Sequence, residues 1–203
     1  MKAGKTMTGK EILYSILMNN NVVYSIENNL EPLLNLIPEL KDTIGFDHKH
    51  PHHHLDVWNH TLCALSHAPS NFDLRLVLLL HDIGKPHSCQ EGEVRHFKGH
   101  PLKSYEMSLV ILERLNFTQE EINHLSKLIL VHDDELTIEE IQTNKESAFE
   151  RFQIQYCDSL AHHPNKLEKR IAYLLDTNEK LNTGNIKEYY YKLLNEASNK
   201  KTR

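Results

Sequence analysis

One short segment constrains the fold and the function of this chain more than any other. The uninterrupted apolar run 76–80 ends in His81-Asp82-Ile83-Gly84-Lys85-Pro86. Such a run is typical of a buried helix, and an imidazole and a carboxylate at its end cost desolvation free energy unless a partner compensates them. A bound cation is one such partner, because neutral imidazole and carboxylate are both metal ligands. The alternative is a polar helix end, in which Gly84 adopts a left-handed C-terminal turn.

The composition indicates a folded, helical chain. Of the 203 residues, 39% are apolar and 25% are charged, which is typical of a chain with a buried core. The length suits one large domain. The net charge of −5, with the histidines neutral, provides no global basic field for nucleic acid, so DNA is not an expected partner.

The cysteines and the absence of long apolar runs bear on the compartment. Cys63, Cys89 and Cys157 form an odd, sparse set without zinc or redox spacing, and no signal peptide is apparent. No run approaches the ~18 apolar residues that span a bilayer. The sequence therefore predicts a cytoplasmic location and no membrane partner.

Helical periodicity recurs along most of the chain. Thr118 with Glu121, and Thr137 with Glu140, have the spacing of capping boxes, and Pro164 suits a helix start. The predicted helices are 10–18, 22–30, 55–68, 72–80, 100–115, 118–132, a short one after Thr137, 147–161, one from Pro164 closed by Gly184, and 186–194, with a short extended piece over 94–97. The sequence therefore predicts an all-α fold.

Several polar residues share faces with apolar residues of these helices, or begin a helix. They are His60, His81, Asp82, His132 and Asp158, with His100 at a helix start. Each alone is more often a buried polar group that the protein itself satisfies. Together they come from different helices, and helical bundles build metal sites from inward-facing residues of this kind. By contrast, most histidines of the run 48–54 are expected to lie in a solvated loop.

Three segments together match a known pattern. They are 57–62, which contains His60, 79–85, which contains His81 and Asp82, and the helix around Asp158. This pattern resembles the H…HD…D signature of the HD superfamily of metal-dependent phosphohydrolases, of the HDIG type. The resemblance covers roughly residues 36–165.

Within that superfamily the chain most resembles the HD domain of bacterial CCA-adding tRNA nucleotidyltransferases. The segments that carry this likeness are Ile37-Pro38-Glu39-Leu40, His54-Leu55-Asp56-Val57-Trp58, and Phe97-Lys98-Gly99-His100 with Ser104. The chain departs from those enzymes because no Gly-Ser followed by paired aspartates appears, so nucleotide addition is not expected. It also lacks the Gly-Tyr-Pro segment of cyclic-di-GMP phosphodiesterases.

The resemblance implies an HD-domain helical bundle with an N-terminal helical extension. Residues 1–45 would form the extension packed on the core, 46–165 the metal-binding domain, and 166–203 the helices that complete the bundle. His60, His81, Asp82 and Asp158 would hold one divalent ion, with Mn, Fe, Ni, Co, Zn and Mg all compatible with the donors. His100 and His132 would add a second ion bridged by Asp82. The alternative is that His100 caps a helix and His132 is a cation at a helix C-terminus.

The resemblance also implies a phosphatase or phosphodiesterase that uses metal-activated water. Its substrate would be a phosphomonoester or phosphodiester of a nucleotide, a cyclic nucleotide such as a 2′,3′-cyclic phosphate, or an RNA 3′ end. The residues given catalytic roles are Asp82, Lys85 and Asp56, and those given substrate-binding roles are Lys85, His96 and Arg151. The alternatives are a solvated Lys85, an exposed Asp56–His60 pair, a non-catalytic nucleotide-sensing module, and an accessory to tRNA or RNA processing.

Overall fold

The computed structural model describes residues 7–182, and this part of the chain is all-α, as predicted. No β-strand occurs between residues 7 and 182. One isolated antiparallel bridge pairs Gln90 with His96, close to the predicted extended piece. The predicted helix 186–194 lies outside the described residues.

The helices follow one another with short connections, except for the loops before α4 and α6. Their bounds are α1 Gly9–Leu17, α2 Val22–Asn28, α3 Leu30–Leu36, the 3₁₀ helix η1 Pro38–Thr43, α4 Val57–Ser66, α5 Phe72–Leu80, α6 His100–Arg114, α7 Gln119–Leu130, α8 Ile138–Thr143, α9 Lys145–Leu160 and α10 Pro164–Leu181. The predicted helix 22–30 ends at Asn28, and α3 begins two residues later. Both predicted capping boxes are present, at the N-termini of α7 and α8.

The end of α10 corrects one prediction. The helix ends at Leu181 and not at Gly184, because Asn182 adopts the left-handed conformation with φ of 54°. Asparagine is one of the few residues besides glycine that adopts this conformation at low cost. The residue that closes the helix is therefore Asn182 and not the predicted Gly184.

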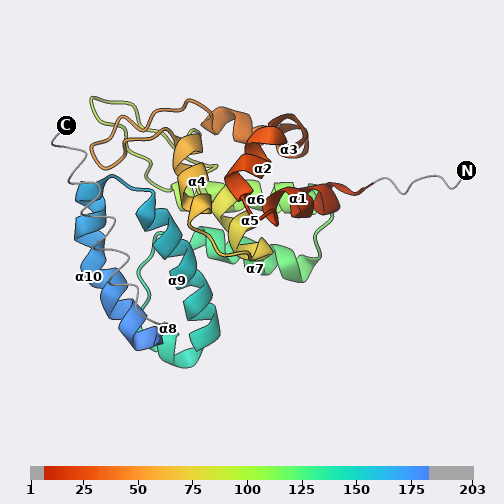
Figure 1. The fold of residues 1–203 in the computed structure, drawn as a ribbon. Helices are drawn as coiled ribbons and strands as arrows, with labels where there is room; N and C mark the ends of the chain where they lie inside the picture. Colours follow the sequence, from red (N-terminus) through yellow and green to blue (C-terminus); the bar gives the residue numbers. More distant parts are fainter. Residues whose placement is uncertain (1–6, 183–203) are drawn as a thin grey trace, which may run out of the picture.

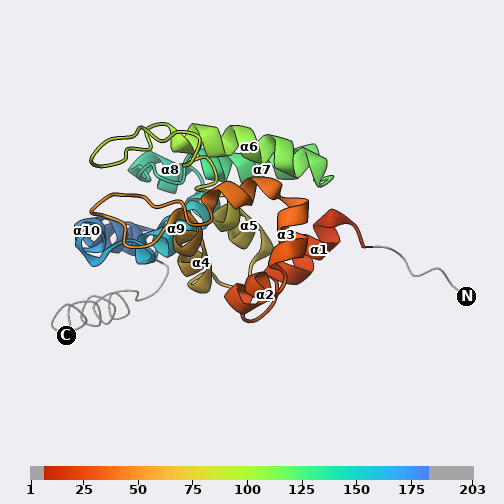
Figure 2. The ribbon, with the colours of Figure 1, turned by 90° about the horizontal axis from the view of Figure 1, so that it is seen from above.

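Helix α5 lies at the centre of the fold. Every residue from Leu74 to Leu80 is buried, and α5 contacts α1, α4, α7 and α9. Figures 1 and 2 show α5 between α4 and α7 in both views. Each buried Leu or Val contributes about 1.5–3 kcal/mol relative to an exposed one, so α5 is a large part of the core. The packing of α4, α7 and α9 on α5 therefore fixes where these helices end relative to the end of α5.

The buried apolar residues form two clusters. The larger cluster joins α1 to α7 with part of α9 around α5. The smaller cluster lies among α8, α9 and α10 and includes Phe152, Leu167 and Leu174. Figure 1 shows α8, α9 and α10 extending together to one side of the other helices. Helices α1 and α2 pack on α5 and α4, while the domain boundaries at 45 and 165 stay a prediction.

Two further features bear on the compartment. The helices between residues 7 and 182 include none with the length and apolarity of a membrane span. Cys63, Cys89 and Cys157 are free thiols, and Cys157 is buried. The cytoplasmic location stays a prediction.

Candidate metal centre

Three helices bring four of the predicted ligands to one point. His60 lies in the middle of α4, His81 and Asp82 follow α5 directly, and Asp158 lies in the last turn of α9. Helix α4 packs on both α5 and α9, so residues that are far apart in sequence meet here. His60 and His81 are 0% exposed, and Asp82 is 1% exposed.

The donor atoms of these residues surround a common point. Asp158 Oδ1 lies 2.8 Å from His60 Nε2 and 3.5 Å from His81 Nε2. Asp82 Oδ2 lies 3.6 Å from His60 Nε2 and 3.2 Å from His81 Nε2. Donors that lie about 2.0–2.2 Å from one divalent ion lie roughly 3–3.5 Å from each other. The spacing therefore fits a single coordination sphere.

Both histidine rings are oriented by backbone carbonyls. His60 Nδ1 lies 3.3 Å from the Ala161 oxygen, and His81 Nδ1 lies 2.7 Å from the Leu78 oxygen. A carbonyl only accepts, so each Nδ1 carries a hydrogen, and each Nε2 is the nitrogen left to face the centre, where it would bind an ion once it carries no proton. Metal-binding histidines are commonly held in this way by their second nitrogen.

Buried groups of both charge signs meet at this point. Burial alone would raise the pKa of Asp82, but His81 and Lys85 hold that pKa well below its usual range. Burial alone would lower the pKa of His81, but the Asp82 and Asp158 carboxylates outweigh it and raise that pKa to about 10. Within residues 7–182, His81 Nε2 and both Asp82 oxygens have no hydrogen-bond partner, although Lys85 Nζ lies 2.6 Å from Oδ2. Buried nitrogen and oxygen atoms of these types, without a hydrogen-bond partner, are suitable ligand atoms for a divalent ion.

Asp82 also faces two further histidines. Its Oδ1 lies 3.2 Å from His100 Nε2 and 3.9 Å from His132 Nε2. The two Nε2 atoms lie 3.3 Å apart, while each Nδ1 faces a backbone carbonyl, at 3.0 Å and 2.7 Å. With both Nδ1 atoms carrying hydrogen, the two Nε2 lone pairs face each other, which a cation between them would relieve. The donors therefore fit a second ion on the other side of Asp82.

Gly84 allows α6 to pack against this centre. This role differs from the left-handed helix end that the sequence allowed for Gly84. It has no positive φ, so it does not form a left-handed cap. A Cβ at Gly84 would lie 2.5 Å from Ser104 N and 2.9 Å from the His100 carbonyl oxygen. The Gly84 amide donates to Ser104 Oγ at 3.0 Å. The missing side chain allows this close approach and so places His100 beside Asp82.

A cleft of about 320 Å³ opens over the centre. Lys85 and His96 both line it, together with Asp82 and Asp158. Lys85 is only 5% exposed, so it is not a solvated lysine, and its Nζ also lies 3.2 Å from His48 Nε2. The predicted positions of Lys85 and His96 are therefore both at the candidate site.

Two predicted residues lie away from the donors. Asp56 is the N-cap of α4, where its carboxylate accepts from the Asn59 backbone at 2.7 Å and from the Asn59 side chain at 2.9 Å. The contact that orients His60 comes from Ala161 instead. Arg151 lines a different cleft, of about 470 Å³, among α7, α8 and α9. It donates to Glu140 at 2.7 Å and to the Asp134 carbonyl.

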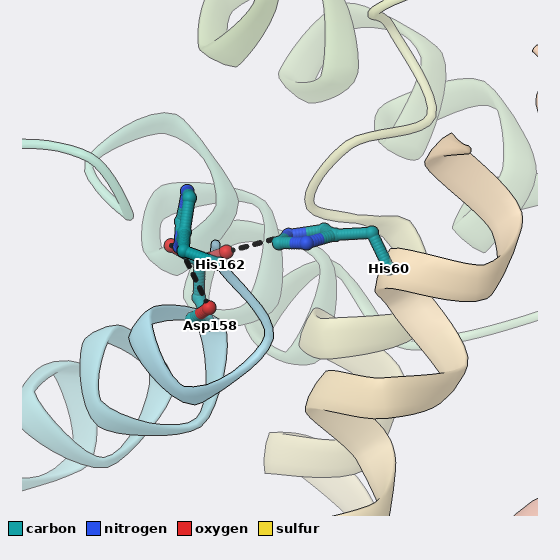
Figure 3. Close-up of side chains that lie close together, drawn as sticks. All are labelled: His60, Asp158 and His162. Atoms are coloured by element: carbon teal, nitrogen blue, oxygen red, sulfur yellow. Dashed lines mark hydrogen bonds and ion pairs between the residues drawn. The ribbon is translucent and has the colours of Figure 1, made fainter. Parts of the chain in front are cut away.

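Sequence reasoning did not single out three histidines that lie near the centre, two of them in the run 48–54, where most histidines were expected to be solvated. His48 is 1% exposed, and His53 stacks on it with ring centroids 3.8 Å apart. His162 is buried four residues after Asp158, and Figure 3 shows both facing His60. His162 lies two residues past the end of α9, where its Nδ1 donates to the Asp158 carbonyl at 2.9 Å, and its i,i+4 spacing from Asp158 is the signal that the sequence contained.

The fold and the converging ligand atoms thus define an all-α protein with a candidate metal centre. About half of the chain is similar in sequence to known proteins. Over 108 residues it is 33% identical to the CC-adding tRNA nucleotidyltransferase of Thermus thermophilus, a match over 49% of this chain and 25% of that protein. Over 117 residues it is 30% identical to the A-adding tRNA nucleotidyltransferase of Deinococcus radiodurans, over 54% and 27%. The chain spans about a quarter of the length of these curated relatives.

These similarities support a relation between this chain and the tRNA nucleotidyltransferases. No protein-family model matches the chain. Membership of the HD superfamily therefore stays a prediction.

Proposed function

We propose that this chain is a metal-dependent phosphohydrolase. His60, His81, Asp82 and Asp158 would hold its divalent ion, and His100 and His132 would hold a second one with Asp82. The observation that carries the proposal is the convergence of these buried donors: for the first ion, an oxygen of Asp82 and an oxygen of Asp158 each lie 2.8–3.6 Å from the Nε2 atoms of His60 and His81. The orphaned His81 and Asp82 atoms support it, because a chain gains nothing from burying them without a ligand.

The chain's own residues supply orientation and charge. The carbonyls of Ala161 and Leu78 fix the histidine tautomers, and the buried Asp82 and Asp158 carboxylates attract the cation. When bound, a divalent ion lowers the pKa of water and offsets charge on phosphoryl oxygens. Lys85 places a positive charge at the mouth of the centre, where it would attract a phosphate.

The proposed substrate is a phosphoester of a nucleotide, a cyclic nucleotide or an RNA terminus. The cleft is lined by positive groups, among them Lys85, Arg95 and Lys98, which suits an anionic ligand. The named relatives act on tRNA, which favours a nucleotide or an RNA end over an unrelated phosphoester. His96, at the edge of the cleft, is placed to contact the part of the substrate beyond the phosphate.

The test begins with the purified chain stripped of metal by a chelator. It is reloaded separately with Mn, Fe, Ni, Co, Zn or Mg and assayed on nucleoside monophosphates, 2′,3′-cyclic nucleotides and aryl phosphodiesters. We expect metal-dependent turnover, and a fall of at least about tenfold in metal content and turnover in Asp158→Asn. Asp176→Asn is the matched control, because Asp176 is an exposed carboxylate on α10. Equal turnover with and without metal would refute the proposal.

The similarity to tRNA nucleotidyltransferases favours a second candidate, an accessory to tRNA processing or a non-catalytic nucleotide sensor. It matches only about a quarter of those enzymes, and the sequence lacks their Gly-Ser and paired-aspartate motif. The same preparations separate the two candidates. Tight nucleotide or tRNA binding by the metal-loaded chain, without turnover of any phosphoester, would favour the second.

A further inference from the structure

Two lysines of the cleft are each held by a buried histidine. Lys85 Nζ lies 3.2 Å from His48 Nε2, and Lys166 Nζ lies 2.5 Å from His162 Nε2. Lys85 follows α5, whereas Lys166 lies in the first turn of α10. Both line the cleft over the metal centre. The same arrangement is thus built twice, from unrelated segments.

The other nitrogen of each histidine fixes the direction of these contacts. His48 Nδ1 donates to the Leu55 carbonyl at 2.8 Å, and His162 Nδ1 donates to the Asp158 carbonyl at 2.9 Å. Because Nδ1 carries the hydrogen, each Nε2 accepts, and the neighbouring ammonium donates to it. One of the three ammonium hydrogens is used in this way; Lys85 directs another to Asp82 Oδ2 at 2.6 Å, and the remaining hydrogens are left for the cleft.

The two pairs belong to one layer of rings. His53 stacks on His48 at 3.8 Å and lies 4.9 Å from His162, measured between ring centroids. His60 contacts this layer, with its centroid 5.0 Å from that of His162. The layer therefore ties the positions of both lysines to a metal-binding residue.

The two lysines differ in how much positive charge they offer to a ligand. Lys85 is paired with Asp82 at 2.6 Å, so that carboxylate neutralises much of its charge. Lys166 forms no close ion pair within residues 7–182; the Asp158 and Asp133 carboxylates act on it only at longer range, and its close polar partner is His162. A largely buried ammonium without a close counter-ion is costly, and an anion in the cleft would compensate it.

We infer that Lys166, positioned by His162, is the second cation of an anion subsite in this cleft, and that with Lys85 it binds a phosphate oxyanion. This deepens the proposed function, on which its biological meaning rests. It adds a substrate-binding residue on α10, beyond the segments that resemble known enzymes. Lys85 stands beside the ion, and Lys166 stands on the Asp158 side of the cleft.

The test is calorimetric titration of inorganic phosphate into the full chain, with and without Mn, while metal content is measured in parallel. We expect Lys166→Met to weaken phosphate binding at least about tenfold, or roughly 1.4 kcal/mol, with unchanged metal content. Lys169→Met is the control, because Lys169 is an exposed lysine on the same helix, and it should bind as wild type. Lys166→Arg should recover part of the affinity.

His162 is a positioning residue, and a pair of variants isolates that role. His162→Gln keeps an acceptor for Lys166 and should retain most phosphate affinity, whereas His162→Phe should lose as much as Lys166→Met. Unchanged phosphate affinity in Lys166→Met, or parallel loss of metal and phosphate, would overturn the inference. So would the absence of phosphate binding by the wild-type chain at millimolar phosphate. Lys166-dependent phosphate binding without turnover of any phosphoester would refute the hydrolase proposal and leave the anion subsite standing.

Discussion

Two buried polar clusters of this protein look alike by burial and differ in how their charges are satisfied. Among helices α8, α9 and α10, Arg151 is buried, yet its terminal nitrogens donate hydrogen bonds to Glu140 and to the carbonyls of Asp134 and Glu135. At the metal centre, within the described residues, His81 Nε2 and both Asp82 oxygens have no hydrogen-bond partner. Of the Arg151 side chain only Nε lacks a hydrogen-bond partner within residues 7–182, whereas the unpartnered His81 and Asp82 atoms face one another at the candidate metal centre.

The difference teaches how to separate a structural charge from a ligand-binding one. Arg75 supports the distinction, since it is also buried and donates to the carbonyls of Leu17, Asn19 and Ala68. Buried charges that close with backbone oxygens connect segments of the fold. Buried ligand atoms that converge on each other, and for which the chain supplies too few hydrogen-bond partners, mark the place of an external cation.

The largest expected effect comes from Asp82→Ala. It should weaken binding of the first ion more than about 100-fold, because Asp82 is shared by both sets of donors. The measurement is competition of the chain with a chelator for Zn or Mn. Helicity in the metal-free state is measured beside it, because the substitution also removes the carboxylate partner of the buried Lys85 and so carries a cost in stability of its own. Metal affinity equal to that of wild type would mean that the converging donors are only structural.

Arg151→Met should have the opposite pattern. We expect it to lower the free energy of unfolding by about 1–3 kcal/mol, because the carbonyls of Asp134 and Glu135 lose their donor. Urea unfolding measures this change. Metal affinity should stay within about twofold, since Arg151 lines the other cleft. A weaker affinity for phosphate with unchanged stability would instead restore Arg151 to the substrate-binding role that the sequence suggested.

An exposed pair gives the smallest effect and completes the comparison. Arg114 donates to both oxygens of Glu39 at 2.8 Å, and this contact holds the pKa of Glu39 below its usual value. Its stabilisation is therefore present above the unfolded pKa and is lost as pH falls through the folded one. We expect Glu39→Gln to cost about 0.2–1 kcal/mol at neutral pH and almost nothing in strong acid, at a pH below the folded pKa of Glu39. Urea unfolding at both pH values checks this, and a cost that persists in acid would argue against the ion pair.

Much of the candidate site could be predicted because its residues lie in regular helices. His60 and Asp158 lie on the buried faces of α4 and α9, and His81 follows the buried run that forms α5. Helical periodicity therefore carried the information. It fails for His48 and His53, because a loop has no periodicity and only the folded chain decides which histidine turns inward.

Arg151 and Gly84 show two other limits. Arg151 shares a face of α9 with Asp158, but seven residues of helix separate them by about 10 Å along the axis, which the face alone does not reveal. Gly84 could serve a left-handed turn or a close approach, and both leave the same residue in the sequence. Only the backbone of α6 beside it distinguishes them.

The bare backbone at position 84 has one consequence for metal stoichiometry. Helix α6 touches the segment after α5 there without any side chain between, and this contact holds His100 against Asp82. A single added methyl group would act as a wedge and move His100 outward, while His60 and Asp158, on α4 and α9, would keep their places. One added carbon atom at position 84 would therefore remove the second set of donors and leave the first set in place.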